Sequence, residues 1–360
     1  MPVQGSWIFS NRPWSEQVKR RLPQPRELFK AVECQKFGAS TCFLCGRRLG
    51  KKNRSDEHVI PEWLQERFNL WDMHLTLLNG TSIPYRKLTI PCCDSCNNEV
   101  LSPIEERIAS ATKSGVKALQ ELPTSALFIW LSKLMYGLLY KEGFLRADRR
   151  SQRKAAIVPR AMLERFGMLH QFMQSCRLPL TFNGFHPASI YIVECQEPKV
   201  RELGFDFRDS TPSLAISIRI GSVGILAALQ DGGAHLATTG EYMSGLAELA
   251  LHPLQFEELT AKFIYHACKF NRVPKYLFME GPKGIEVVQM PLQGVSRKPL
   301  FDPWVHREYA DCLAQQTGLP ADKLFVPPDK LMTWLQNEDG DFCDLSFERQ
   351  PWPVPGSARA

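Results

Sequence analysis

The sequence reads Cys42-Phe43-Leu44-Cys45 and Cys93-Asp94-Ser95-Cys96, with Glu57-His58-Val59-Ile60-Pro61 between the two pairs and Asn97 directly after the second. Two residues separate the cysteines of each pair, and this spacing lets one tight turn direct both sulfurs to the same point. Two such pairs supply the four thiolates of a tetrahedral zinc site. We therefore predict one structural Zn²⁺ on Cys42, Cys45, Cys93 and Cys96.

The residues beside the cysteines offer a different kind of ligand. Glu57 and Asn97 carry oxygen atoms, which favour a hard divalent cation, whereas sulfur favours zinc. His58 follows Glu57 directly, and a neutral imidazole can accept a proton from water near neutral pH. These three residues are the predicted catalytic residues, with Glu57 and Asn97 as ligands of Mg²⁺ or Mn²⁺.

In these motifs the chain resembles the HNH, or ββα-metal, endonucleases of the zinc-knuckle subtype. Their pattern is a CxxC, then Asp or Glu followed by His, Ile or Val, any residue and Pro, and then a CxxC followed by Asn. The match covers about seventy of the 360 residues, from Thr41 to Glu106, with each part in the family's order. Asp is more usual in the family where Glu57 stands, so the longer side chain changes the distance to a bound cation.

The resemblance implies a fold and a reaction. The fold would be a small zinc-stabilised ββα-metal nuclease domain, followed here by a separate α+β domain. The reaction would be hydrolysis of phosphodiester bonds in DNA: His58 activates water, and the cation on Glu57 and Asn97 stabilises the leaving 3′ oxygen. Asn79 is the best match for the family's middle asparagine, although Asn79-Gly80 is equally typical of a plain turn.

Hydrophobic periodicity and turn residues predict the elements and the domains. Helices are expected over 62–68, 97–112, 125–141, 160–176, 253–270 and 330–337. Strands are expected over 57–60, 188–195, 214–220, 223–229, 276–279 and 286–290. The predicted organisation is a basic segment over 1–40, the HNH domain over 41–112, an α+β domain of unknown role over 113–295, and an extension over 296–360 with a disordered end.

Charge and cysteine usage limit the partners and the compartment. Residues 1–54 hold twelve Lys and Arg against three Glu, an excess of nine that surpasses the net charge of +6 for the whole chain. A basic segment beside a metal site favours a polyphosphate partner, and a solvated arm is the equally weighted alternative. Arg54, Arg86 and Lys87 are candidate phosphate contacts. The seven cysteines outside the two pairs are scattered, which favours a reducing, cytoplasmic location.

Two other functions remain open at this point. The chain could be a non-catalytic zinc-stabilised nucleic-acid-binding protein, or a nuclease effector of anti-phage defence. DNA is the expected partner and RNA is not excluded, while the oligomeric state and the nucleic-acid structure recognised cannot be read from the residues. The N-terminus shows no basic region followed by an apolar run, and no apolar run reaches the ~20 residues that a bilayer requires.

Overall fold

A computed structural model of the chain describes residues 27–34, 38–143, 160–282, 284–293 and 297–352, without the side chains of 160–163. The chain forms two compact units. Unit 1 comprises Met1–Asn183 and Phe278–Val288, and unit 2 comprises Gly184–Leu277 and Gln289–Ala360. Their boundaries do not coincide with the predicted ones at 112/113 and 295/296. Most of the 1–40 segment lies outside the described residues, and so does the part of the predicted disordered end, 349–360, that follows residue 352.

Unit 1 begins with short strands and continues into helices. Its strands are β1 (Arg54–His58), β2 (His74–Thr76), β3 (Ser82–Pro84), β4 (Thr89–Cys93) and β5 (Leu180–Asn183). Its helices are α2 (Glu62–Arg67), the turn η1 (Tyr85–Lys87), the π-helical turn η2 (Ser95–Leu101), α3 (Ser102–Ser114), α4 (Val116–Gln120), α5 (Thr124–Glu142), α6 (Arg160–Met173) and η3 (Gln174–Cys176). β1 pairs antiparallel with β4, and β2 with β3. The predicted helices over 62–68, 97–112, 125–141 and 160–176 are confirmed.

Helix α5 is the central support of unit 1. Almost all of its residues are buried, including Trp130 and Lys133. It approaches the residue that follows β1 so closely that a Cβ on Gly137 would lie 2.9 Å from the side chain of Val59. Its far end donates from Lys141 Nζ to the carbonyl of Thr89 on β4, at 3.1 Å. The helix therefore packs directly on the β1–β4 pair, although the predicted domain boundary separated it from that pair.

A three-stranded sheet completes unit 1 from a distant part of the sequence. It has the order β11-β12-β5, with β11 at Tyr276–Gly281 and β12 at Gly284–Gln289. β12 pairs parallel with β5. Phe182 on β5 makes edge-to-face contacts with Phe128 of α5 and Phe172 of α6. The chain thus leaves unit 1 after residue 183 and returns to add strands to it.

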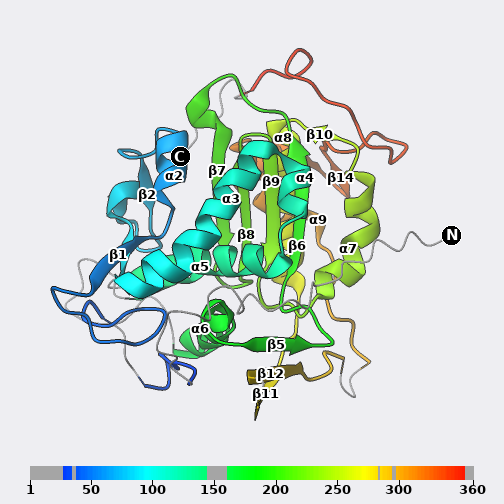
Figure 1. Cartoon of the computed structure of the whole chain (residues 1–360). Helices are drawn as coiled ribbons and strands as arrows, with labels where there is room; N and C mark the ends of the chain where they lie inside the picture. The colour runs from blue at the N-terminus through cyan, green and yellow to red at the C-terminus, as the bar shows by residue number, and fades with distance from the viewer. Residues whose placement is uncertain (1–26, 35–37, 144–159, 283, 294–296, 353–360) are drawn as a thin grey trace. The chain divides into compact units, whose positions relative to one another are not determined.

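Unit 2 is built around a five-stranded sheet of order β10-β6-β9-β8-β7 (Figure 1). The strands are β6 (Ser189–Cys195), β7 (Phe205–Ser210), β8 (Ala215–Ile220), β9 (Val223–Ala228) and β10 (Ala250–Leu251), and the turn η4 (Arg201–Gly204) precedes β7. Every residue of β8 and β9 is buried. Strands covered on both faces read as continuous apolar runs, and this explains why the β8–β9 hairpin was predictable.

Helices α7 (Ala234–Gly245) and α8 (Pro253–Lys269) cover this sheet. After β12 the chain forms α9 (His306–Thr317), α10 (Ala321–Leu324), β13 (Phe325–Val326) and β14 (Lys330–Leu331). Helix α8 begins with a capping box, in which the His252 side chain accepts from Leu254 N–H and the Gln255 side chain accepts from His252 N–H. A Cβ on Gly224 of β9 would clash with the ring of Phe256, so α8 packs closely on the sheet.

The predicted helix over 330–337 is wrong. Residues 330–331 form β14, and the chain then turns. The backbone N–H groups of Trp334 and Leu335 donate to the carboxylate of Glu258 on α8, at 2.6 and 3.1 Å. In a helix those N–H groups would instead donate to carbonyls one turn earlier.

The mixture of helices and strands is confirmed for the chain. None of the helices in the described ranges has the length and apolar character needed to cross a bilayer.

Candidate metal centre

Four cysteine sulfurs converge in unit 1. The ligand atoms of Cys42, Cys45, Cys93 and Cys96 all lie within 4.8 Å of one another, and the sulfurs of Cys45 and Cys93 are 3.8 Å apart. A tetrahedral zinc with bonds of about 2.3 Å holds its sulfurs about 3.8 Å from each other. The donor set and its spacing therefore fit a metal such as zinc, at the four residues that the sequence predicted.

Backbone geometry brings the two pairs together. Gly46 follows the first pair with a φ of +73°, which glycine adopts without strain, and its N–H donates to the Cys42 carbonyl at 3.0 Å. The N–H of Phe43 donates to the carbonyl of Pro91 on β4, at 2.9 Å, which joins the first turn to the strand that carries Cys93. The Asp94 side chain accepts from Ser95 N–H and so caps the turn η2. Both pairs are therefore fixed by the same strand.

A fifth cysteine lies beside the cluster and outside it. The sulfur of Cys92 is 3.9 Å from that of Cys42, but Cys92 is not among the four residues whose ligand atoms all converge. Hydrogen bonds from neighbouring thiols, Cys45 first, lower the pKa of Cys42 to about 3. The hydrogen bond with Cys42, together with burial, raises the pKa of Cys92. The metal is therefore assigned to the four converging sulfurs, and Cys92 lies beside them.

Helix α6 supports the first cysteine turn from behind. His170 is buried, and its Nε2 lies 2.7 Å from the carbonyl oxygen of Phe43. Burial lowers the pKa of His170 to about 4, so the ring is neutral and donates to that carbonyl.

All eleven cysteines fall within the described residues, and none forms a disulfide.

The register of β1 and β4 sets where the predicted catalytic residues point. Side chains alternate between the two faces of a strand, and the burial of β1 follows this alternation, with Glu57 buried and Asp56 exposed. Asn97 Nδ2 donates to Ser55 Oγ at 2.7 Å. Ser55 and Glu57 share a face of β1, so the structure brings Asn97 to the face that carries Glu57.

The carboxylate of Glu57 is buried and ion-paired. Its Oε1 lies 2.6 Å from Lys133 Nζ, and the same ammonium lies 2.6 Å from Glu105 Oε1. Lys133 also donates to the carbonyl of His58 at 2.7 Å, so all three of its N–H groups have an acceptor. Burial, opposed by the Lys133 charge, raises the pKa of Glu105 to about 7. From the sequence alone Glu105 is most simply a surface residue of the helix predicted over 97–112, and the structure instead places it in this ion pair.

His58 points the other way from Glu57. It is the last residue of β1, and its Nδ1 lies 3.2 Å from Oε1 of Glu62 at the start of α2. Its ring centroid is 6.1 Å from that of Trp71. The structure thus groups Glu57 with Asn97 on one face and places His58 at the strand end, partly exposed, with a carboxylate partner of its own.

The predicted phosphate contacts differ in how they are held. Arg54 donates to Asp56 and to the carbonyl of Ala39, and Arg86 pairs with Asp72. Lys87 is exposed. Asn79 accepts from the N–H of Thr81 at 3.0 Å inside the β2–β3 turn, which is the local turn role that its sequence also suggested.

Comparison with protein-family models, with curated proteins and with solved structures finds no match. Inference about function therefore depends on the metal centre and on the residues around it. Sequence reasoning missed Lys133 as a member of this site. The signal was present, because a lysine in an otherwise apolar buried helix requires a carboxylate partner.

Proposed function

We propose that the protein is a zinc-stabilised endonuclease of the HNH type that hydrolyses phosphodiester bonds in DNA. The observation that carries the proposal is the contact between Asn97 and Ser55. It brings the start of the helix after the second CxxC onto the Glu57 face of β1, beside four converging thiols. A zinc-binding knuckle without chemistry needs neither this asparagine nor a histidine at the strand end.

His58 is the proposed general base. Glu62 lies within hydrogen-bond distance of its Nδ1, so a proton held on Nδ1 leaves Nε2 as an acceptor for a proton from water. Partial exposure of the ring permits substrate access. Glu62 therefore has a positioning role in the proposal, since it selects the tautomer of His58.

Glu57 and Asn97 are the proposed ligands of a catalytic Mg²⁺ or Mn²⁺. When bound, such a cation would neutralise charge that develops on the leaving oxygen. In the arrangement described, the Glu57 carboxylate instead binds the Lys133 ammonium, and Asn97 donates to Ser55. The proposal therefore requires Glu57 to exchange its ion pair for the cation.

DNA is the proposed partner, because the residues leading into the metal centre are strongly basic. Single-stranded DNA and RNA are alternative substrates of the same chemistry. A cytoplasmic location belongs to the proposal as well, since free thiols are ordinary in a reducing compartment.

The test is cleavage of DNA by the zinc-loaded full-length protein. Supercoiled plasmid, a single-stranded oligonucleotide and a structured RNA are each incubated with Mg²⁺ or Mn²⁺. We expect His58→Ala to lower the cleavage rate by about 10²–10⁴-fold, the usual contribution of a general base. His74→Ala, a histidine exposed on β2, is the matched control and should cleave like the wild type. No cleavage of any substrate, or equal cleavage by His58→Ala, would reject the proposal.

A second candidate function is a nucleic-acid-binding module without chemistry. The burial of Glu57 in an ion pair with Lys133 favours it, because a structural carboxylate cannot serve as a metal ligand at the same time. Fluorescence anisotropy with labelled DNA separates the two functions. Unchanged affinity in Glu57→Gln, His58→Ala and Asn97→Ala, with no cleavage by any of these proteins or by the wild type, would support the binding module.

A further inference from the structure

Unit 2 contains a cavity of about 240 Å³ between helices α7 and α8. Its wall is mainly apolar and includes Met243 from α7, Leu259 and Phe263 from α8, and Trp304 from the segment before α9. The volume is below the ~300–1,000 Å³ of sites for drug-sized ligands. A cavity of this size and lining suits a single aromatic ring or a short aliphatic chain.

One cationic side chain lines the cavity. Lys262 of α8 has Nζ 3.0 Å from the hydroxyl of Tyr242, with Nζ 4.5 Å from the centroid of that ring. Among the described residues no carboxylate lies within ion-pair distance of Lys262. Glu258, one turn earlier, is the nearest candidate, but its oxygens accept from Thr333 Oγ1 and from the N–H groups of Trp334 and Leu335.

The Lys262 ammonium is partly buried and has no carboxylate within ion-pair distance among the described residues. Burial lowers the pKa of Lys262, and the charge of Glu258 opposes the shift. An incompletely neutralised, partly desolvated ammonium gains more from an anionic partner than one in water does. A single ammonium suits a monoanion, whereas a phosphate dianion is usually held by several cationic or N–H donors.

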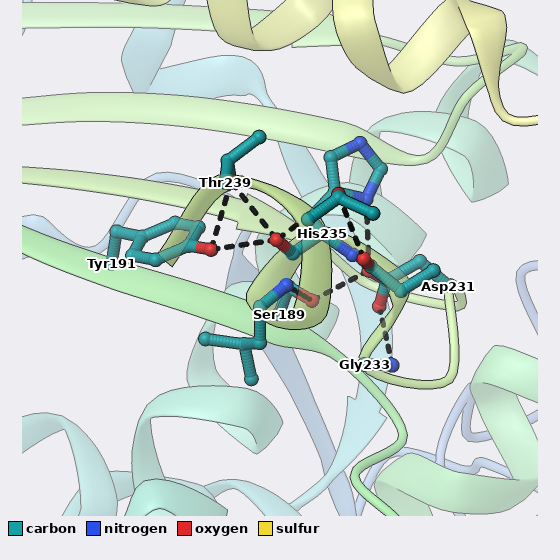
Figure 2. Close-up of polar contacts among 9 residues, drawn as sticks. Ser189, Tyr191, Asp231, Gly233, His235 and Thr239 are labelled. Carbon is teal, nitrogen blue, oxygen red and sulfur yellow. Dashed lines mark hydrogen bonds and ion pairs between the residues drawn. The ribbon is translucent and has the colours of Figure 1, made fainter. Parts of the chain in front are cut away.

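The wall behind the cavity is rigid. Thr239, another lining residue, shares a hydrogen bond of 2.9 Å with the hydroxyl of Tyr191 on β6. Asp231 accepts from Ser189 Oγ and from the N–H and Nδ1 of His235, and so fixes the first turn of α7 to the sheet (Figure 2). These bonds hold the α7 side of the cavity in place, and a wall that needs little rearrangement lowers the entropy cost of binding.

His266 adds an uncharged polar group to the lining. Its Nδ1 is buried and has no hydrogen-bond partner among the described residues. Burial first, and then the neighbouring His235, lower the pKa of His266 to about 4. The ring is therefore neutral at pH 7 and adds no second charge beside Lys262.

We propose that this cavity binds a small carboxylic acid with an apolar body, whose carboxylate pairs with Lys262 and whose ring or chain fills the apolar wall. The site lies wholly in unit 2 and does not depend on the proposed hydrolase. A short fatty acid and a single-ring aromatic acid share this chemistry, and the test has one arm for each.

Isothermal titration of the zinc-loaded full-length protein tests the proposal. The probes are hexanoate and phenylacetate, each compared with the neutral amide of the same shape, hexanamide and phenylacetamide. We expect at least one acid to bind about tenfold or more tightly than its amide, which corresponds to about 1.4 kcal/mol. The arm that binds identifies the apolar body.

Variants of Lys262 show how much of the binding depends on its charge and how much on the fit of the apolar body. Lys262→Met should bring the Kd values of acid and amide together, and Lys262→Arg should keep the preference for the acid. Lys199→Met removes the same charge from an exposed position and should bind like the wild type. The melting temperature of each variant reports folding. Equal affinity for acid and amide in the wild type, a preference that survives Lys262→Met, or no binding of either acid up to ~10 mM would each overturn the proposal.

Discussion

Glu57 in unit 1 and Asp231 in unit 2 are both buried carboxylates, but their partners differ in kind. Glu57 is neutralised by the ammonium of Lys133, which lies 76 positions further along the chain on another helix. Asp231 accepts hydrogen bonds from its own turn, through the N–H groups of Gly233 and His235 and the ring of His235, and from the hydroxyl of Ser189.

The difference shows that the same group has two structural functions. In unit 1 the Glu57 carboxylate joins β1 to α5 through the ammonium of Lys133, which Glu105 of α3 also binds. Loss of that ammonium would leave two buried carboxylates without a cation. In unit 2 the carboxylate caps the first turn of α7 through hydrogen bonds, so its loss affects a local segment. Three changes test this contrast, and they follow from the largest expected effect to the smallest.

Loss of the metal should produce the largest difference in stability between unit 1 and unit 2. Structural zinc supplies about 10–16 kcal/mol of apparent binding free energy in zinc-finger peptides at neutral pH. We expect Cys93→Ala to lose the zinc and to unfold the β1–β4 pair, which contains Glu57, while β8 and β9 stay folded. Hydrogen exchange of the amides in both sheets, with metal analysis, measures this.

The control for the metal is the adjacent cysteine. Cys92→Ala should retain one zinc per chain, because the Cys92 sulfur lies outside the group of four. Loss of zinc in Cys92→Ala but not in Cys93→Ala would contradict the assignment of ligands. Equal protection of β1 and β4 with and without metal would show that the thiols do not hold this part of unit 1.

Removal of the ammonium should have the next largest effect. Lys133→Met leaves Glu57 and Glu105 buried without a cation, and breaking a buried pair costs about 3–5 kcal/mol. Urea unfolding measures the loss in the free energy of unfolding. Lys113→Met, at an exposed position on α3, should change it little. Adding Glu57→Gln and Glu105→Gln to Lys133→Met should restore part of the lost free energy of unfolding. If it does not, the loss comes from altered packing and not from unpaired charge.

Removal of the local cap should have the smallest effect. Asp231→Ala leaves several buried donors without an acceptor, and we expect a loss of about 2–4 kcal/mol from the free energy of unfolding of unit 2. Asp311→Ala, exposed on α9, is the matched control. Zinc content and the hydrogen exchange of β1 should stay as in the wild type. A large loss of protection in β1 would show that the Asp231 cluster is not a local feature.

The fold was predictable where local signals are strong. The helices over 97–112 and 125–141 and the hairpin around Gly221 followed from apolar periodicity and from a turn residue, and all three are present. β7, α7 and α9 were not predicted, since their burial depends on neighbours far away in sequence. The chain near Trp334 was misassigned because Glu258 takes its backbone N–H groups, and no local pattern reveals such a partner.

The candidate site also has one part that the sequence predicts and one part that it does not. The cysteine cluster was predictable from spacing alone, since ligands close in sequence meet through a single turn. The pairing of Glu57 with Lys133 was not, because it depends on α5 packing against β1. The Ser189, Asp231 and His235 group has no sequence signature either, since Ser189 lies 42 positions before Asp231.

The return of the chain to unit 1 has a practical consequence for anyone who wishes to prepare that unit by itself. A gene fragment that stops at residue 183 would omit β12, the strand that pairs with β5. The edge of β5 that β12 occupies would then be unpaired, and such exposed strand edges promote aggregation. A usable fragment would need residues 278–288 joined back through a short linker.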